Sequence, residues 1–252
     1  MQEVGIIIPV YNGRRGIADS TWLQDSIESA LHSDLASLIV TVVDDGSTDD
    51  TAEIVNKYLG ERLQLIRSVE NKGVASALNL GIANTEAKYI AIQGSDDICK
   101  PEKARMQAEL LNSSPDIQMV GCYYWMCRQD GTLVDEITDV SIAPADIRLD
   151  LISGNCKIGL VMFRRTLWEE IGGFDDINCP RCCEDMDFFL RTVERYPAGI
   201  TIVPELLYGY RRSAQQLTDQ NYYGPYWKAL ELSRERRRNH SDRNGIYRPK
   251  PC

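Results

Sequence analysis

The sequence lacks any apolar run of the roughly 18 residues that a membrane-spanning helix needs. Its first apolar run, Val4 to Val10, is far shorter, follows no basic residue and precedes no small-residue cleavage site. We therefore interpret this run as a strand and not as a signal peptide. Together these absences predict a cytoplasmic protein.

Basic residues are outnumbered by acidic ones, 28 Lys and Arg against 37 Asp and Glu, and histidine is scarce. The formal net charge of −9 argues against general nucleic-acid binding, for which a basic surface is expected. His32 and His240 are the only two histidines, and no Ser/His/Asp set is evident, so a histidine-based mechanism is not expected. Residues 11–16 are a poor substitute for the Gly-rich, basic loop of nucleotidyltransferases, which leaves that class a weak alternative.

Basic residues are concentrated near the end of the sequence. Seven Lys or Arg lie between Arg234 and Lys250, against two acidic residues. This segment is either a solvated helix end with a loose tail or a peripheral contact with anionic lipid or a partner. The aromatic stretch from Tyr222 to Trp227 either packs on the domain or forms a contact in an oligomer.

Eight cysteines without a secretory signal indicate a reducing compartment and free thiols. Cys179, Cys182 and Cys183 contain a CxxC pattern, but a second ligand pair at the usual spacing is missing. Free thiols in a loop are therefore favoured over a structural zinc site.

The first part of the chain alternates strand and helix patterns. Strands are expected at 4–10, 38–43, 63–66 and 89–92, and helices at 23–31, 51–59 and 74–82. This order predicts an α/β fold with a mostly parallel sheet that helices cover on both sides. The less regular second part is expected to form strands at 118–127, 158–163, 200–203 and 206–211, and helices at 101–112, 186–196 and just before 172–173.

These patterns suggest one domain over 1–218, with a nucleotide-binding half (1–97) and an acceptor half (98–218) that share one sheet. Residues 219–252 are expected to form an aromatic and basic helical tail. No Pro/Gly/Ser linker separates the two halves.

Polar residues follow successive strands of the predicted sheet. They are Tyr11-Asn12-Gly13, Asp44-Asp45-Gly46-Ser47 and Gly94-Ser95-Asp96-Asp97. Ligands of open parallel sheets bind beyond the carboxyl ends of the strands, so these residues should converge. Carboxylates there suit Mg²⁺ or Mn²⁺ held jointly with substrate phosphates, and Asp96 is the first candidate ligand. The alternative is that Asp96 and Asp97 cap a helix near Pro101.

Six ordered motifs resemble those of the family 2 glycosyltransferases, over about residues 4 to 218. They are Pro9-Val10-Tyr11-Asn12, Val43 to Asp49, Asn71-Lys72-Gly73 with Ala77 to Gly81, Gly94-Ser95-Asp96-Asp97, Gly172-Gly173-Phe174-Asp175 and Glu184-Asp185-Met186-Asp187. The resemblance implies a GT-A fold, a nucleotide-sugar donor, a saccharide or lipid-linked acceptor, and transfer with inversion. A UDP-sugar is the first candidate donor, and polysaccharide or glycoconjugate biosynthesis the expected setting.

The same resemblance implies roles for individual residues. Donor contacts would come from Pro9, Tyr11, Asn12, Asp45, Asn71, Lys72, Gly73, Asn79, Ser95, Asp96 and Arg211. Asp45 would accept a uracil N–H, Lys72 would approach a phosphate, and Asp96 would bind Mn²⁺ or Mg²⁺ at the diphosphate. Asp185 would be the catalytic base, unless it only stabilises a helix N-terminus.

Two positions depart from the usual pattern. Gly94 stands where the family commonly has an aspartate, and Ser213 stands where a histidine often binds the metal. Arg211 and Arg212 are either diphosphate partners or a solvent-facing pair. The departures raise the alternative of a catalytically weak sugar-nucleotide-binding or scaffold protein, against which Asp45, Asp96 and Asp185 argue.

Overall fold

The computed structural model describes residues 2–13, 16–17, 20–128, 130, 132–137, 157–179, 184–211 and 231–232. The strands are β1 (Gln2–Val10), β2 (Gly16–Ile17), β3 (Ser20–Thr21), β4 (Leu38–Asp44), β5 (Leu63–Arg67), β6 (Ala87–Ile92), β7 (Ile98–Cys99), β8 (Met119–Cys127), β9 (Leu133–Ile137), β10 (Met162–Arg164) and β11 (Ile200–Arg211). The helices are α1 (Trp22–Leu31), α2 (Thr51–Asn56), α3 (Val74–Ala83), α4 (Lys103–Ser113), the 3-10 helix η1 (Ile158–Leu160), α6 (Arg165–Ile171) and α7 (Glu184–Arg195).

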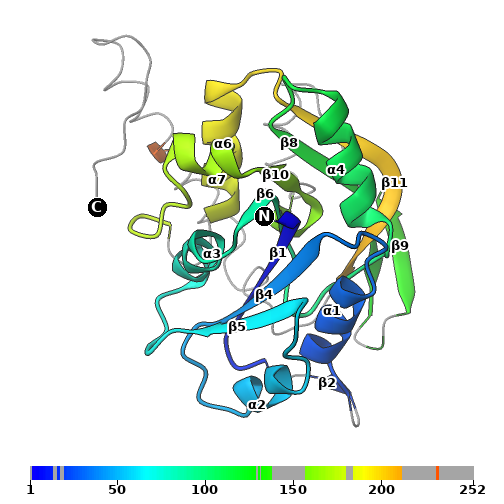
Figure 1. The fold of residues 1–252 in the computed structure, drawn as a ribbon, viewed down its shortest axis with the longest axis vertical. Coiled ribbons are helices and arrows are strands. Elements are labelled where there is room, and N and C mark those ends of the chain that lie inside the picture. The colour runs from blue at the N-terminus through cyan, green and yellow to red at the C-terminus, as the bar shows by residue number, and fades with distance from the viewer. Residues whose placement is uncertain are drawn as a thin grey trace.

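One sheet of nine strands runs through the domain, in the order β5-β4-β1-β6-β10-β8-β11-β7, with β9 paired to β8 (Figure 1). β5, β4, β1 and β6 are parallel, and β8 and β11 run in the same direction because β10 is antiparallel to both β6 and β8. The carboxyl ends of these six strands therefore share one edge of the sheet. This arrangement confirms the predicted α/β fold with a mostly parallel sheet.

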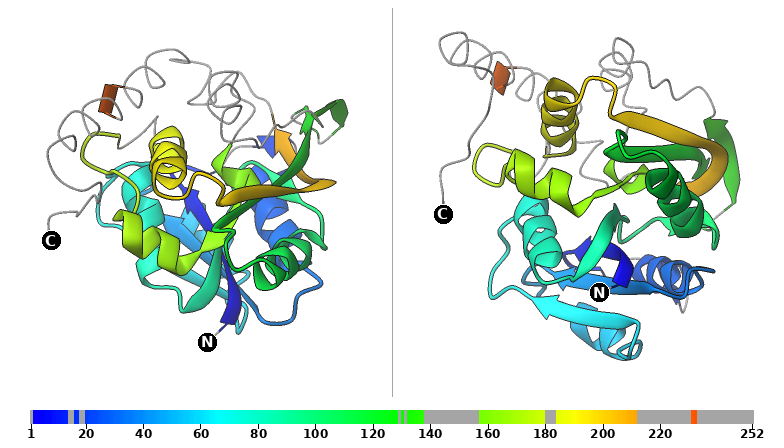
Figure 2. Two further views of the ribbon diagram at one scale, coloured as in Figure 1. Left: turned by 90° about the horizontal axis from the view of Figure 1, so that it is seen from above. Right: turned by 45° about the horizontal axis from the view of Figure 1, so that its top comes forward.

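Helices cover both faces of the sheet, with α3 and α6 on one side and α1 and α4 on the other (Figure 2). The central strand β1 is buried from both sides, as its continuous apolar run requires, and Val4, Ile7 and Ile8 are fully buried. α3 approaches closely at Gly81, where a Cβ would lie 2.7 Å from side-chain carbons of both Ile7 and Val43. A glycine at this position thus permits the tight packing of α3 on the sheet.

The segment predicted as a strand over 158–163 differs from the structure. η1 occupies its first half, and only Met162–Arg164 form a strand, β10. Any side chain at Gly159 would overlap the hydroxyl of Tyr208, and the Gln107 amide donates to the Leu160 carbonyl at 2.8 Å. These tertiary contacts replace the ladder bonds that a strand would have made.

Other boundaries also shift. α2 ends at Asn56, earlier than expected, and the two strands expected between 200 and 211 are one strand with register shifts after Val203. α4 begins at Lys103 with Glu102 as its N-cap residue, so Asp96 and Asp97 do not cap this helix. The capping alternative for these two aspartates is wrong.

The four cysteines that the structure describes divide into two groups. Cys99, Cys122 and Cys127 are free, as expected. Cys179, which is 1% exposed, is disulfide-bonded, so the expectation of free thiols is wrong for this residue. Cys182 and Cys183 lie outside the described residues, as do Arg212, Ser213 and almost all of the tail. Within the described part of the chain, every helix is too short or too polar to span a bilayer.

Candidate functional site

Asp45 joins the end of β4 to the loop before α3. Its Oδ1 accepts the N–H of Lys72 at 3.0 Å, and its Oδ2 accepts the N–H of Gly73 at 2.8 Å. Gly46 has a φ of +74° and passes so close to this loop that a Cβ would lie 2.6 Å from the Glu70 carbonyl carbon. A carboxylate oxygen has two lone pairs, so the buried Asp45 can still accept a hydrogen bond from a ligand.

Asn12 joins the end of β1 to the same turn. It adopts a left-handed backbone with a φ of 51°, its N–H donates to Ser47 Oγ at 2.9 Å, and its Oδ1 accepts the N–H of Thr48 at 2.9 Å. Tyr11 beside it is 45% exposed, and Pro9 is half-buried. The predicted base-binding residues after β1 and β4 are therefore brought together, with one aromatic ring open to solvent.

Asn71 and Ser95 are half-buried, the first in the loop before α3 and the second after β6. Lys72 is exposed, and its Nζ lies 3.8 Å from Glu70 Oε1. An exposed pair of this kind is weak, so it leaves the Lys72 side chain available for a ligand.

Asp97 is the buried member of the aspartate pair after β6. It is 5% exposed, and it accepts the Tyr208 hydroxyl at 2.7 Å and the Arg211 N–H at 2.8 Å. Burial, reinforced by the negative charge of Asp96, raises the pKa of Asp97 to about 8. The Tyr208 hydroxyl also accepts the N–H of Gly94 at 2.9 Å. Tyr208 thus ties β11 to this loop.

The absence of a side chain at Gly94 follows from the same contacts. A Cβ there would lie 2.5 Å from Asp97 Oδ2 and 3.2 Å from Asp96 Oδ1. The Asp97 carboxyl therefore fills the space into which an aspartate at position 94 would project.

We expect Asp97→Asn to stabilise the metal-free protein increasingly as the pH rises. The folded protein binds the Asp97 proton up to about pH 8, whereas the group has a pKa of 3.8 without the fold, so this residue costs stability as the pH rises between these values. An amide avoids that cost. The difference in melting temperature, variant minus wild type, should grow by at least about 2 °C between about pH 6 and pH 9 in EDTA. A constant difference would show that Asp97 does not titrate in this range.

Arg211 supports the Asp96 loop from β11. Its Nε donates to the Asp96 carbonyl at 2.8 Å, its Nη2 lies 2.9 Å from Asp25 Oδ2, and its guanidinium lies 5.6 Å from the ring centroid of Trp22. The residue is 3% exposed, so of the two alternatives the solvent-facing one is wrong for Arg211. These contacts favour a positioning role over direct phosphate binding. Asp25 and Trp22 were missed because nothing in their local pattern marks them.

Asp185 lies in the first turn of α7, half-buried, with its Oδ1 accepting the N–H of Met186 at 2.7 Å. Burial raises the pKa of its carboxyl, and the positive charge of Lys157 opposes that rise. α7 is anchored by the buried Asp187–Arg191 ion pair of 2.7 Å and by the Phe188 ring, which stacks on Phe174 with centroids 4.4 Å apart.

Asn79 is not brought to the strand ends. From the middle of α3 its Nδ2 donates to the Phe174 carbonyl at 2.9 Å, and its Oδ1 accepts the Phe174 N–H at 2.9 Å and the Trp168 Nε1–H at 3.1 Å. It therefore fixes the Gly172-Gly173-Phe174-Asp175 motif that leads toward α7. Trp168 was missed in the sequence because it stands 89 residues from its partner.

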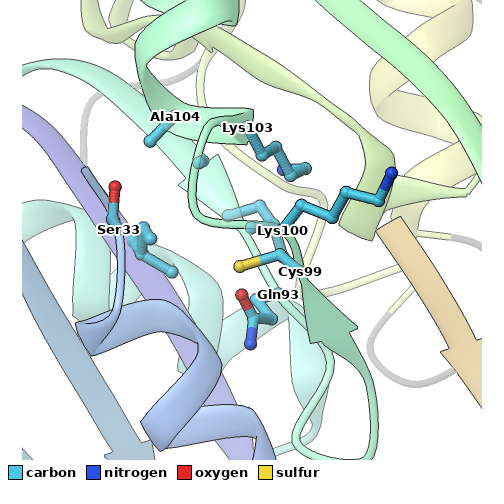
Figure 3. Close-up of a pocket in the computed structure, with 9 residues that line it drawn as sticks. Ser33, Gln93, Cys99, Lys100, Lys103 and Ala104 are labelled. Atoms are coloured by element: carbon cyan, nitrogen blue, oxygen red, sulfur yellow. The ribbon is translucent and has the colours of Figure 1, made fainter. Parts of the chain in front are cut away.

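A small cavity of about 10 Å³ lies next to the end of β6, with Gln93, Cys99 and Lys103 among its lining residues (Figure 3). It has room for about one water molecule. The Gln93 amide donates to the Ser26 carbonyl at 2.8 Å, so this cavity belongs to the packing of α1 on the sheet and is no donor pocket.

The part of the chain that the structure describes has no cluster of three or more His, Cys, Asp or Glu side chains that could hold a metal. Asp96 is thus a single carboxylate candidate. This fits Mg²⁺ or Mn²⁺ only where substrate phosphates complete the coordination, a common arrangement for these ions.

A sheet of this topology, with aspartates at the carboxyl ends of its strands, defines the GT-A class of glycosyltransferases. The chain belongs to glycosyl transferase family 2, whose model matches residues 5–170. Both the family and the fold expected from the motifs are confirmed.

Known proteins of this kind resemble the chain over most of its length. EpsE of Bacillus subtilis (strain 168), described as a glycosyltransferase, is 26% identical over 225 residues, which are 87% of this chain and 77% of EpsE. The structure of S. aureus TarS 1-349 in complex with UDP-GlcNAc has a TM-score of 0.71 at 18% identity, over 92% of this chain and 65% of that one. The mannosyltransferase PcManGT from Pyrobaculum calidifontis, in complex with GDP-Man and Mn²⁺, has a TM-score of 0.63 at 19% identity, over 98% of this chain and 66% of that one. The chain thus spans about two thirds of these solved structures, which at such identities show the fold alone.

Proposed function

We propose that the protein transfers a hexose from a nucleoside-diphosphate donor, a UDP-sugar first of all, to a hydroxyl of a saccharide or lipid-linked acceptor with inversion. The observation that carries this proposal is that Asp45 and Asp96 follow β4 and β6 at the carboxyl edge of one sheet, while Asp185 lies in the first turn of α7, each held by backbone or tertiary contacts. The sugar nucleotides bound by TarS and PcManGT support it.

The nucleotide base would lie at the ends of β1 and β4. Tyr11 offers an exposed ring for stacking, and Asp45 keeps lone pairs for a base N–H. Because Asp45 is already fixed by two backbone N–H groups, it needs no reorganisation when the donor binds.

The diphosphate would lie by the β6 end. Asp96 would hold Mn²⁺ or Mg²⁺, and Arg211 keeps the Asp96 backbone in place. A bound divalent ion supplies stabilisation of the negative charge on the leaving diphosphate. Asp96 fixes where that charge can be accommodated.

Asp185 would act on the acceptor. Its carboxylate accepts the proton of the acceptor hydroxyl while that oxygen forms a bond to the anomeric carbon. The bond from the anomeric carbon to the diphosphate oxygen breaks on the opposite face, and its electron pair leaves with the diphosphate. A raised pKa makes Asp185 a stronger base than an ordinary aspartate.

A catalytically weak sugar-nucleotide-binding or scaffold protein is the second candidate, favoured by the missing carboxylate at Gly94. In this fold the Asp97 carboxyl occupies the space beside Gly94, so the glycine is accommodated by its neighbours. This contact weakens the argument that Gly94 marks a lost activity. Polysaccharide or glycoconjugate biosynthesis remains the proposed setting.

A thermal-shift panel of UDP, GDP, dTDP and CMP, each with and without Mn²⁺, tests the binding step. A ligand that binds only the folded state raises the melting temperature. We expect a metal-dependent shift with one nucleotide, and donor turnover with that nucleotide's sugars. No shift with any nucleotide at several millimolar would contradict donor binding, whereas a shift without turnover would favour the scaffold function.

A further inference from the structure

Lys157 is a basic residue that the motif comparison does not single out. It directly precedes η1, and its Nζ lies 4.4 Å from the ring centroid of Tyr210 near the end of β11. Two residues further on, Gly159 packs against the Tyr208 hydroxyl. Two aromatic rings of β11 therefore hold the 157–159 segment at the carboxyl edge of the sheet.

The contact with Tyr208 brings this segment to the loop after β6. The Tyr208 hydroxyl, against which Gly159 packs, donates to Asp97 Oδ2 at 2.7 Å and accepts the Gly94 N–H at 2.9 Å. Toward α7, the positive charge of Lys157 opposes the rise that burial causes in the pKa of Asp185. Lys157 therefore lies near the loop proposed for the diphosphate and within electrostatic reach of the residue proposed as base.

Binding a diphosphate at this edge of the sheet would place its negative charge close to carboxylates. Asp96 follows β6 at this edge, and a bound diphosphate would bring more anionic oxygens beside it. The guanidinium of Arg211 is buried against Asp25 and the Asp96 carbonyl, and Lys72 belongs to the loop before α3. A positively charged side chain near the loop after β6 would stabilise the negative charge of the departing diphosphate.

We propose that Lys157 contacts the diphosphate of the donor and supplies protein-borne positive charge to it in addition to that of the metal. This inference rests on the proposed function. The chemistry it implies is an ammonium donating charge-assisted hydrogen bonds to phosphate oxygens. Part of the diphosphate affinity should therefore persist without any metal.

The test is the binding of UDP against UMP, and of GDP against GMP, by titration calorimetry in EDTA. For the pair that binds wild type, Lys157→Met should weaken nucleoside diphosphate binding by about tenfold or more, the scale of one hydrogen bond to a charged group. The monophosphate should change by less than about twofold. Lys157→Arg should restore most of the diphosphate affinity.

Lys88→Met is a matched control. Lys88 Nζ lies 4.7 Å from the Tyr89 ring centroid, a contact like that of Lys157, but at the amino end of β6 and bonded to Asn112 Oδ1 at 2.6 Å. This variant should bind like wild type, and all variants should melt within a few degrees of it.

Unchanged diphosphate binding by Lys157→Met, equal losses for diphosphate and monophosphate, or wild-type binding that occurs only with Mn²⁺ would overturn the role of Lys157 alone. A raised acceptor KM with unchanged diphosphate affinity would assign Lys157 to the acceptor instead and also overturn it. A wild-type protein that binds no nucleotide, with or without Mn²⁺, would overturn the proposed function itself.

Discussion

Asp185→Asn is expected to slow sugar transfer by at least about 100-fold, the usual contribution of a general base. The amide keeps the shape of the side chain and its acceptor for the Met186 N–H, but it cannot take a proton from the acceptor hydroxyl. Donor binding should stay within about twofold of wild type, because the proposed role of Asp185 is at the acceptor and not at the nucleotide. Product formation and donor titration on the same preparation measure the two effects.

Asp176→Asn, an exposed aspartate of the loop before α7, is the matched control and should retain full activity. A rate for Asp185→Asn above about a tenth of wild type would remove Asp185 as the base. The carboxylate would then only stabilise the N-terminus of α7.

Asp96→Ala is expected to remove most of the increase in donor affinity that Mn²⁺ produces. Among the described residues there is no metal-binding cluster, so under the proposed function the ion would depend on Asp96 and on the phosphates of the donor. Donor titrations with and without Mn²⁺ should show the metal effect reduced by at least about tenfold.

Asp97→Asn is the control here, because the Asp97 carboxyl is directed to Tyr208 and to the Arg211 N–H. The two neighbouring aspartates should therefore differ: one variant loses the metal effect and the other keeps it. If Asp96→Ala responds to Mn²⁺ like wild type, the ligand lies elsewhere in the chain.

The first half of the fold could be predicted because its signals are local. The apolar runs of β1 and β4 and the stripes of α1 and α3 lie within a few residues, and each predicted element is present. η1 could not be predicted in this way. Its departure from a strand depends on Gly159 meeting Tyr208 and on Gln107 bonding to Leu160, contacts made by residues distant in sequence.

The site shows the same division. Motif order brought Asp45, Asp96 and Asp185 forward as candidates, but the sequence treats Asp96 and Asp97 alike. Their difference comes from Tyr208, which stands 111 residues from Asp97. From the sequence, Gly94 is likewise interpreted as the loss of a metal-binding carboxylate. The structure shows instead that the Asp97 carboxyl occupies the space that a side chain at position 94 would need. Contacts of this kind leave no periodic or spaced pattern to detect.

The place of β10 in the sheet has a consequence for how the chain folds during synthesis. β10 lies between β6 and β8 although it is made only at residues 162–164. Domains start to form from the N-terminal end as the ribosome extends the chain. The parallel strands up to β6 can therefore assemble early, with one edge of β6 left open for some 70 residues of elongation, from Ile92 to Met162. An open edge invites pairing with other chains, so the growing polypeptide is most prone to aggregate before this short strand arrives.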